Sequence, residues 1–499
     1  MKTILNGLKF YLILSVVYLI NFQVGAQSVN SKDSIDIFLQ NKMQKLNIPG
    51  LQLAVIRDGK LVKLKSYGIA NVENSIDVTN SSVFSINSCT KAFVGVAVMQ
   101  LQEEGKLNVN DYVSKYIDSL PSDWRKITIR QVLSNTSGLP NIIDQYENIF
   151  EGGDEKKAWE KVKTLPAEFK AGEKFSYNQT GYVMVGKIID KVSGISFVDF
   201  IKQRQFDVAG MNTTQFGDSG DVIFRSAGGY SMLTNDNGNW TGTKKLKNIF
   251  VTFPPYFRAC SGILSTAEDL SKWLIALQNG QLLKDKQSID ILWSSVKLNN
   301  GSVSGLNKLV NSYALGWPVV VRDEHPAVAP VGGMRSSFFV YPKDDLSIIV
   351  LTNLQGANPE WFIDEIAGYY IPEMHQSNGF GLSVSMKKLR LALIKDKYCN
   401  AEKTVSKLKK NKQFAITEDD INDFGYRLLN ENKYDQALKV FELNVSLFPT
   451  SSNAYDSYGE ALAVKGDIEN SVKNYKKSLK FNPDNANAAE QILKLKKLK

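Results

Sequence analysis

The hydrophobic and polar positions of the chain form two similar hairpin patterns that lie far apart in the sequence. Near the N-terminus, residues 34–46 have the apolar spacing of an amphipathic helix, and strand patterns follow at residues 51–56 and 61–67. A second pair of strand patterns occupies residues 336–341 and 346–351. Antiparallel strands at both ends, with helices between them, predict an α+β fold whose sheet unites distant parts of the chain.

The segment between the two hairpins predicts mostly helices, interrupted by loops that contain Gly and Pro. Residues 361–370 predict a helix that closes this part of the chain. Because 499 residues are too many for one ordinary domain, a boundary is expected. We place the first domain at residues 28–375.

The C-terminal part of the chain repeats itself. Residues 376–418 are rich in lysine and predict a helical linker, and residues 419–499 contain two units offset by 34 residues. The equivalent positions are Gly425 and Gly459, Ala437 and Ser471, Phe441 and Tyr475, and Pro449 and Pro483. This offset is that of a tetratricopeptide helix pair, so an all-α region of tetratricopeptide repeats is expected.

The N-terminus resembles a secretory signal. Two lysines precede an apolar run at residues 10–22, and the small residues Val24-Gly25-Ala26 follow as a cleavage site. The run is shorter than the ~20 residues that span a membrane, so a signal peptide over residues 1–26, cleaved near Ala26, is favoured over an uncleaved anchor. The protein is therefore expected to be exported, either to the periplasm or out of the cell.

Charge and cysteine content narrow the functional classes. The net charge of +9 is concentrated in residues 376–499, which carry 22 basic against 15 acidic side chains, while residues 28–375 are formally neutral. The positive charge of residues 376–499 is consistent with solvated helix surfaces or with binding to an anionic surface. No segment resembles a nucleic-acid-binding module. The three cysteines leave at least one thiol unpaired, so a disulfide framework is not expected.

Ser88 and Lys91 are the strongest candidates for catalytic residues in this sequence. They lie three residues apart where an apolar helical pattern begins, so their side chains share one face of that helix. A serine needs an adjacent base to act as a nucleophile; the chain has two histidines, and a buried lysine that loses its proton can take that role. The same spacing recurs at residues 294–297, 385–388 and 406–409, which we interpret as solvated helix faces.

Further segments distinguish Ser88 from these other serines. They are, in chain order, Ile48 to Leu51, Thr128 to Pro140, Phe175 to Tyr182 and Cys260 to Leu270. Together with Ser88 they resemble the β-lactamase-related serine hydrolase family, which comprises class C β-lactamases, D-alanyl-D-alanine carboxypeptidases, D-aminopeptidases and related esterases. The resemblance covers residues 35–372 and implies an antiparallel sheet flanked by helices, with a mostly helical subdomain.

The resemblance implies roles for individual residues. Ser88 would be the acylated nucleophile and Lys91 its base, and Tyr177 would relay a proton between nucleophile and leaving group. A core aromatic residue is the alternative interpretation of Tyr177. Gln179 stands where the family has asparagine, so it is expected to orient the substrate through an amide that is one methylene longer.

The third family motif departs most from the usual pattern. Pro330 occupies the position of a lysine or histidine, two residues ahead of Gly332-Gly333. The N–H of Gly333, with that of Ser88, is expected to form an oxyanion hole. Arg335 either offers its cation to a substrate carboxylate or is an exposed strand arginine.

Three other residues near these motifs are expected to be structural. Cys89 is expected to be a buried apolar residue, because a cysteine nucleophile would need its own base. Asn135 stands where the family often has histidine, and His325 is interpreted as a loop residue. Neither a metal ion nor a cofactor is expected, since the implied mechanism needs none.

These features predict an exported serine hydrolase that acts on an amide, ester or lactam carbonyl through a Ser88 acyl-enzyme. The substrate would be a small molecule or a peptide-like compound, and the missing cation at Pro330 favours one without a carboxylate. The alternative is a ligand-binding or sensor protein of the same fold with weakened catalysis, whose repeats recruit a protein partner.

Overall fold

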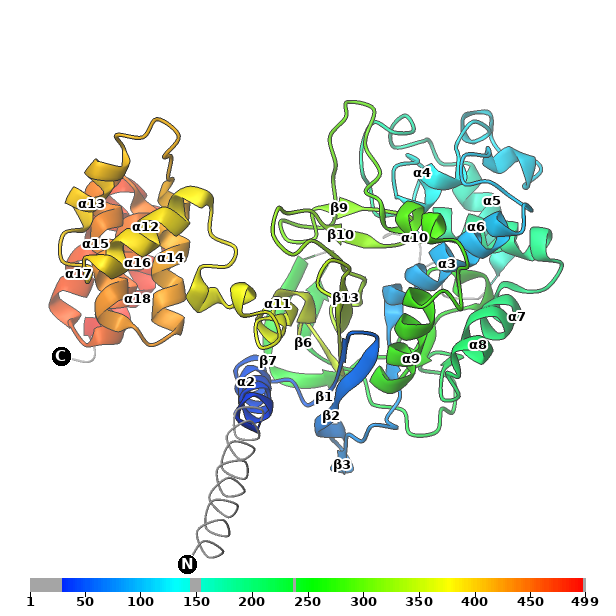
Figure 1. The fold of residues 1–499 in the computed structure, drawn as a ribbon, viewed down its shortest axis with the longest axis horizontal. Helices are drawn as coiled ribbons and strands as arrows, with labels where there is room; N and C mark the ends of the chain where they lie inside the picture. The colour runs from blue at the N-terminus through cyan, green and yellow to red at the C-terminus, as the bar shows by residue number, and fades with distance from the viewer. Residues whose placement is uncertain (1–28, 144–153, 237–238, 497–499) are drawn as a thin grey trace, which may run out of the picture. The chain divides into compact units, whose positions relative to one another are not determined.

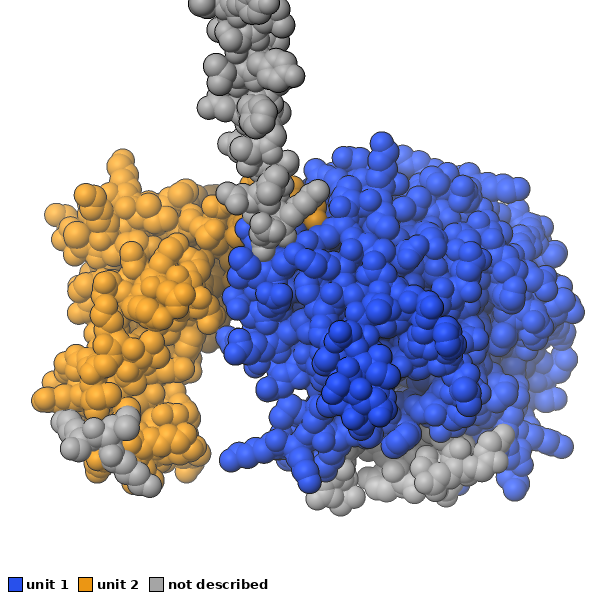
Figure 2. Space-filling model, turned by 90° about the horizontal axis from the view of Figure 1, so that it is seen from below, with its two compact units in different colours: residues 1–367 blue, residues 368–499 orange. Residues whose placement is uncertain are grey.

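The computed structural model describes residues 29–143, 154–236 and 239–496. The chain divides into two compact units, Met1–Ala367 (unit 1) and Gly368–Lys499 (unit 2), which Figure 2 shows in different colours. The division falls after residue 367, whereas the sequence pattern predicts it after residue 375. The predicted signal peptide lies outside the described residues, and within those residues no helix is long and apolar enough to cross a membrane.

A 9-stranded antiparallel sheet forms the centre of unit 1 (Figure 1). Its order is β3-β2-β1-β14-β13-β11-β10-β9, and β12 pairs with β13. The strands are β1 (Gly50–Arg57), β2 (Lys60–Asn71), β3 (Ile76–Asp77), β9 (Ser312–Tyr313), β10 (Pro318–Val320), β11 (Ala327–Val328), β12 (Val331–Gly332), β13 (Ser336–Tyr341) and β14 (Leu346–Thr352). Both predicted hairpins are confirmed, and β1 pairs with β14, so that Leu53 faces Val350 and the sheet unites the two ends of the unit.

Helices cover both faces of this sheet. Every residue of β14 is buried, although successive side chains of a strand point to opposite faces. In Figure 1, α9 (Ala267–Gln278) lies on one side of the central strands, and α2 (Val29–Leu46) and α11 (Ile363–Ala367) lie on the other. An ion pair of 3.0 Å between Lys42 and Glu365 joins α2 to α11.

The sequence between the two hairpins forms a helical part whose centre is α3 (Thr90–Glu103). Every side chain of α3 from Thr90 to Leu101 is buried, because helices pack around it. The other helices are α4 (Ile129–Leu133), α5 (Glu155–Lys163), α6 (Thr180–Ser193), α7 (Phe197–Ile201), α8 (Asp207–Ala209) and α10 (Lys286–Trp293). Two small sheets complete the unit, β4-β8-β5 (Phe84–Ser85, Ile263–Ser265, Gln215–Phe216) and β15-β6-β7 (Leu354–Gln355, Tyr230–Asp236, Asn239–Asn248).

Two local predictions in unit 1 need correction. The predicted closing helix over residues 361–370 is shorter, since α11 covers Ile363–Ala367 and follows a 3-10 turn. Residues 294–297 are not a helix face, because α10 ends at Trp293 and Ser294 has an extended backbone. The N–H of Val296 donates to the carbonyl of Tyr313, which draws this segment toward β9 instead.

Unit 2 is entirely helical within the part of the chain that is described. Its helices are α12 (Val384–Lys395), α13 (Ala401–Leu408), α14 (Glu418–Asn430), α15 (Tyr434–Leu447), α16 (Ser452–Lys465), α17 (Ile468–Phe481) and α18 (Ala486–Lys496). The stretch expected to be a linker contributes Met386 and Leu389 to the same core as Phe424 and Phe441. Residues 384–408 are therefore an integral part of the helical unit and not a linker.

The two offset units in this region make the same contact between helices. A Cβ atom on Gly425 would lie 2.6 Å from the ring of Phe441, and one on Gly459 would lie 3.2 Å from the ring of Tyr475. Glycine thus lets an aromatic ring of the following helix approach the backbone at two equivalent positions. The two sequence repeats therefore share this contact between a glycine and an aromatic ring.

Candidate active site

Ser88 lies in a short turn between a buried strand and a buried helix. β4 leads into the 3-10 turn Asn87–Cys89, and α3 begins at the next residue. Ile86 and Cys89 are fully buried, whereas Ser88 is half-buried. The apolar neighbours thus anchor the turn in the core, and the serine hydroxyl is left at an accessible position.

Lys91 lies one helical turn after Ser88 and is 1% exposed. Its Nζ is 3.4 Å from Ser88 Oγ, and it donates hydrogen bonds of 2.8 Å to Gln179 Oε1 and to the carbonyl oxygen of Cys260. Among the described residues, no carboxylate forms an ion pair with Lys91. The amine is therefore held by neutral oxygens, in a position from which it can exchange a proton with the serine.

Aromatic rings surround the same amine. Lys91 Nζ lies 4.9 Å from the ring centroids of both Tyr177 and Tyr182. Burial raises the pKa of the Tyr182 and Tyr313 phenols well above the usual value, so both stay neutral. Tyr177 is only half-buried, and it is the ring of this group that an incoming substrate can meet.

Asn135 holds the segment that carries Tyr177 and Gln179. Its carbonyl accepts the N–H of Ser176 at 2.9 Å, and its Oδ1 accepts the N–H of Asn178 at 3.0 Å. Asn135 has φ +58°, a left-handed conformation that asparagine adopts more readily than most residues. These contacts agree with the structural role expected of Asn135, and they fix the backbone on both sides of Tyr177.

Two glycines bring β12 against the turn that contains Ser88. A Cβ atom on Gly332 would lie 2.0 Å from the carbonyl oxygen of Ile86, and one on Gly333 would lie 2.7 Å from Cγ of Asn87. Gly333 also has φ +57°, which favours glycine. The end of β12 and the turn that follows it, which contains Gly333, therefore pack directly on the residues that flank Ser88.

The position of the expected motif cation contains no charge. Pro330 is buried, and its carbonyl accepts hydrogen bonds from the Ser337 hydroxyl at 2.8 Å and from the N–H of Phe338 at 3.1 Å. Pro330 thus begins the hairpin of β12 and β13, and it leaves the site without a lysine or histidine at this position.

Arg335 is not the exposed strand arginine that the sequence left open. It is 7% exposed, and its Nη2 donates to Asn87 Oδ1 at 3.0 Å. Burial lowers the pKa of its guanidinium to about 10. The structure therefore brings this cation next to the Ser88 turn, but inside the protein.

The remaining residues singled out in the sequence lie where structural roles would place them. Cys89 is fully buried, as expected, and burial raises the pKa of its thiol. His325 lies in a loop, and its Nδ1 is 2.8 Å from Asp344 Oδ1.

Three further groups at the site had no role predicted from the sequence. These are the carbonyl of Cys260, the ring of Tyr182 and the side chain of Asn87. The first two contact Lys91 from segments remote in sequence, and the third accepts from Arg335. Tyr182 and Cys260 do lie in two of the segments that carry the family resemblance, Phe175 to Tyr182 and Cys260 to Leu270, and that position was the signal available.

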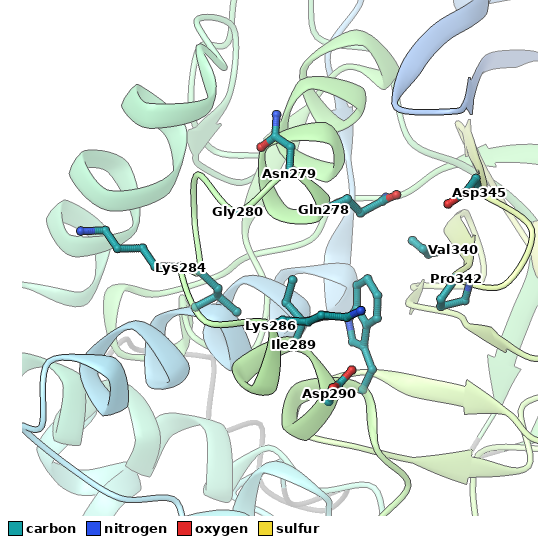
Figure 3. Close-up of a pocket in the computed structure, with 12 residues that line it drawn as sticks. Gln278, Asn279, Gly280, Lys284, Lys286, Ile289, Asp290, Val340, Pro342 and Asp345 are labelled. Atoms are coloured by element: carbon teal, nitrogen blue, oxygen red, sulfur yellow. The ribbon is translucent and has the colours of Figure 1, made fainter.

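A separate hollow of about 510 Å³ lies elsewhere in unit 1 (Figure 3). The end of α9, the start of α10 and the turn between β13 and β14 line it. Its basic residues are Lys284 and Lys286, and its acidic residues are Asp290 and Asp345. It includes neither Ser88 nor any side chain that contacts Lys91.

Comparison with solved structures identifies proteins with a similar fold. The octameric penicillin-binding protein homologue from Pyrococcus abyssi is 24% identical, with a TM-score of 0.59 over 72% of this chain and 81% of that one. A class C β-lactamase in complex with cefoxitin is 21% identical, with a TM-score of 0.55 over 65% of this chain and 94% of that one. Unit 1 therefore has the fold that these proteins share.

The chain belongs to the β-lactamase family, because the family model described as Beta-lactamase matches residues 35–368. Members of this family are serine hydrolases. Protein flp of Staphylococcus aureus strain MRSA252 is 27% identical over 332 residues, which are 65% of this chain and 63% of flp. The chain thus spans less than two thirds of the length of this curated relative.

Proposed function

We propose that this protein is an exported serine hydrolase that cleaves an amide, ester or lactam bond through an acyl-enzyme on Ser88. The observation that carries the proposal is the position of the Lys91 amine, 3.4 Å from Ser88 Oγ and held by Gln179 and Cys260. The ring of Tyr177 beside that amine supports it further. A lysine that served only as a surface charge would have no reason to be buried on neutral oxygens.

In this mechanism, Ser88 Oγ attacks the substrate carbonyl while its proton passes to Lys91. The N–H groups of Ser88 and Gly333 stabilise the tetrahedral oxyanion. When the intermediate collapses, the bond to the leaving group breaks, Tyr177 gives that group a proton, and Lys91 returns a proton to Tyr177. A water molecule then attacks the acyl-enzyme by the same steps in reverse.

Gln179 and Pro330 bear on the choice of substrate. The Oε1 of Gln179 already accepts a hydrogen bond from Lys91 Nζ, which leaves Gln179 Nε2 to orient the substrate. Pro330 supplies no cation for a substrate carboxylate. We therefore rank esters and peptide-like amides above β-lactams as substrates.

The helical unit is proposed to bind a protein partner through tetratricopeptide-type repeats. The equivalent contacts of Gly425 with Phe441 and of Gly459 with Tyr475 support the repeat assignment. Export is proposed from the apolar segment at residues 10–22.

A fluorophosphonate label tests the enzymatic proposal. The full chain is expected to be labelled at one serine, and mass spectrometry of the digested protein is expected to find the label on Ser88. Turnover is then compared on p-nitrophenyl esters, D-amino acid amides and nitrocefin. Labelling at another serine would refute the assignment, rapid nitrocefin hydrolysis would reverse the ranking of substrates, and stable acylation without turnover would favour the ligand-binding alternative.

A further inference from the structure

Arg335 has a charge that the fold buries without an acidic partner. It is 7% exposed, its Nε has no hydrogen-bond acceptor, and no ion pair joins it to an Asp or Glu within the described ranges. Burying an unpaired charge costs stability, and such costs persist mainly where they serve a function. The position of Arg335 therefore needs an explanation beyond folding.

Among the residues that the structure describes, the hydrogen-bond acceptor of its guanidinium is the side chain of Asn87. Nη2 donates to Asn87 Oδ1 at 3.0 Å, while Asn87 Nδ2 donates to the carbonyl of Ser85 at 3.1 Å. Asn87 comes directly before Ser88 and has φ +49°. The hydrogen bond from Arg335 thus holds Asn87 in place, and the left-handed backbone of Asn87 sets the direction of the N–H of Ser88.

Asn87 also contacts the turn after β12, on the other side of the site. A Cβ atom on Gly333 would lie 2.7 Å from Asn87 Cγ, so the Gly333 backbone packs directly on that side chain. Asn87 is therefore common to both backbone segments that are proposed to supply the oxyanion hole. Movement of its side chain would shift the Ser88 and Gly333 N–H groups relative to each other.

The surroundings of Arg335 oppose direct contact with a substrate. Its Nη1 lies 2.8 Å from where a Cβ atom on Gly229 would be, so Gly229 leaves room for the guanidinium in this position. With 7% of the residue exposed, there is no open edge that could accept a carboxylate with two hydrogen bonds. The two Nη atoms of the guanidinium thus lie against Gly229 and Asn87.

We propose that Arg335 is a positioning residue, which holds Asn87 in its left-handed conformation and so aligns the Ser88 and Gly333 N–H groups on the substrate carbonyl. The inference rests on the proposed function. It deepens that function, because it gives Arg335 a role in acylation instead of in substrate recognition. A displacement of about 1 Å in such a site can cost about 100-fold in rate.

A double-mutant cycle on the full chain tests this coupling. The variants are Arg335→Met, Asn87→Gly and the combination, with Arg225→Met as a control on an exposed arginine. Each single variant is expected to lower the rate of fluorophosphonate acylation and kcat on a p-nitrophenyl ester by about 10- to 100-fold, with KM little changed. The double variant is expected to be no slower than the slower single one, since both changes break the same contact.

Stability gives a second readout. Arg335→Met removes a buried unpaired cation, so its thermal unfolding is expected at an equal or higher temperature although acylation is slower. Arg335→Lys keeps a charge and a donor and is expected to recover part of the rate; it also replaces Arg335→Met in the cycle if that variant does not fold.

Four results would overturn the proposal. Losses that add up in the double variant would show that Arg335 acts independently of Asn87. A rise in KM confined to esters with a carboxylate, against matched uncharged esters, would show that Arg335 binds the substrate. If the Arg335→Met variant were acylated as fast as the wild type, the positioning role alone would be refuted. If the wild-type protein were not acylated on Ser88, the proposed function would be refuted as well.

Discussion

The chain contains the spacing Ser-x-x-Lys in both units, with opposite surroundings. In unit 1, the amine of Lys91 is 1% exposed and lies 3.4 Å from the Ser88 hydroxyl. In unit 2, Ser406 and Lys409 are exposed at the end of α13, and the Ser406 hydroxyl donates to the carbonyl of Glu402 at 2.9 Å. The spacing is the same, but the serine of α13 bonds to its own helix.

This difference shows where the chemistry of unit 1 originates. Helical spacing places two side chains on one face, and that holds for both pairs. What is special to Lys91 is the set of partners that replaces water around it: Gln179 Oε1 and the Cys260 carbonyl, both remote in sequence. The environment of Lys91 is a property of the tertiary structure, and the tetrapeptide is only one part of it.

The largest expected effect separates the two serines. Ser88→Ala is expected to abolish fluorophosphonate labelling and to lower kcat on the order of 10⁶-fold, because the acyl-enzyme has no other nucleophile. Ser406→Ala is expected to leave both unchanged. Labelling and ester hydrolysis of the two purified variants measure this. If the Ser88→Ala variant were still labelled, Ser88 would not be the nucleophile, and the different surroundings of the two serines would not reflect catalysis.

The two lysines are expected to differ in rate and in stability. Lys91→Met removes the proposed base and is expected to lower kcat by about 10²- to 10⁴-fold. It also leaves Gln179 Oε1 and the Cys260 carbonyl without their donor, at about 1–3 kcal/mol for each group. Lys409→Met, at an exposed position, is expected to change the free energy of unfolding by less than about 0.5 kcal/mol. Urea denaturation measures the free energy of unfolding of both variants, and ester hydrolysis measures their kcat. Equal effects of the two substitutions would contradict the distinction between the two lysines.

A matched pair of tyrosines sharpens the comparison. Lys91 lies 4.9 Å from the ring of Tyr177, and Lys477 in unit 2 lies 4.9 Å from the ring of Tyr455. Tyr177→Phe keeps the ring beside the amine and removes only the hydroxyl, so a loss of about 100-fold in kcat is expected if that hydroxyl carries a proton. Tyr455→Phe is expected to keep full activity. A Tyr177→Phe variant with normal turnover would reduce Tyr177 to the core aromatic of the alternative interpretation.

Local patterns were enough to predict the frame of unit 1. Both hairpins have the strand period and their turn residues in the sequence, and the apolar run after Ser88 becomes the buried helix α3. The pairing of β1 with β14 was also predictable, because antiparallel strands at both ends of a domain have few other ways to cover their edges.

Features set by contacts remote in sequence were not predictable. Arg335 has the sequence context of an exposed strand residue, and it is buried because Gly229 leaves space and Asn87 supplies an acceptor. The spacing at residues 294–297 resembles a helix face, but Val296 pairs with Tyr313 instead. In both cases the residues that determine the local structure lie in a different element. The hydrophobic pattern of the segment itself therefore does not indicate the outcome.

The smallest expected effect uses the cysteines of the two units. Cys89 and Cys260 are buried in unit 1, and burial raises the pKa of Cys260 to about 12, so its thiol stays protonated near neutral pH. Cys399 in unit 2 is exposed. Iodoacetamide on the native protein, followed by peptide mapping, is therefore expected to modify Cys399 alone and to leave ester hydrolysis unchanged, while all three react in urea. Modification of Cys260 under native conditions, with a parallel loss of activity, would mean that the carbonyl environment of Lys91 is open to solvent, and the contrast between the two lysines would no longer rest on burial.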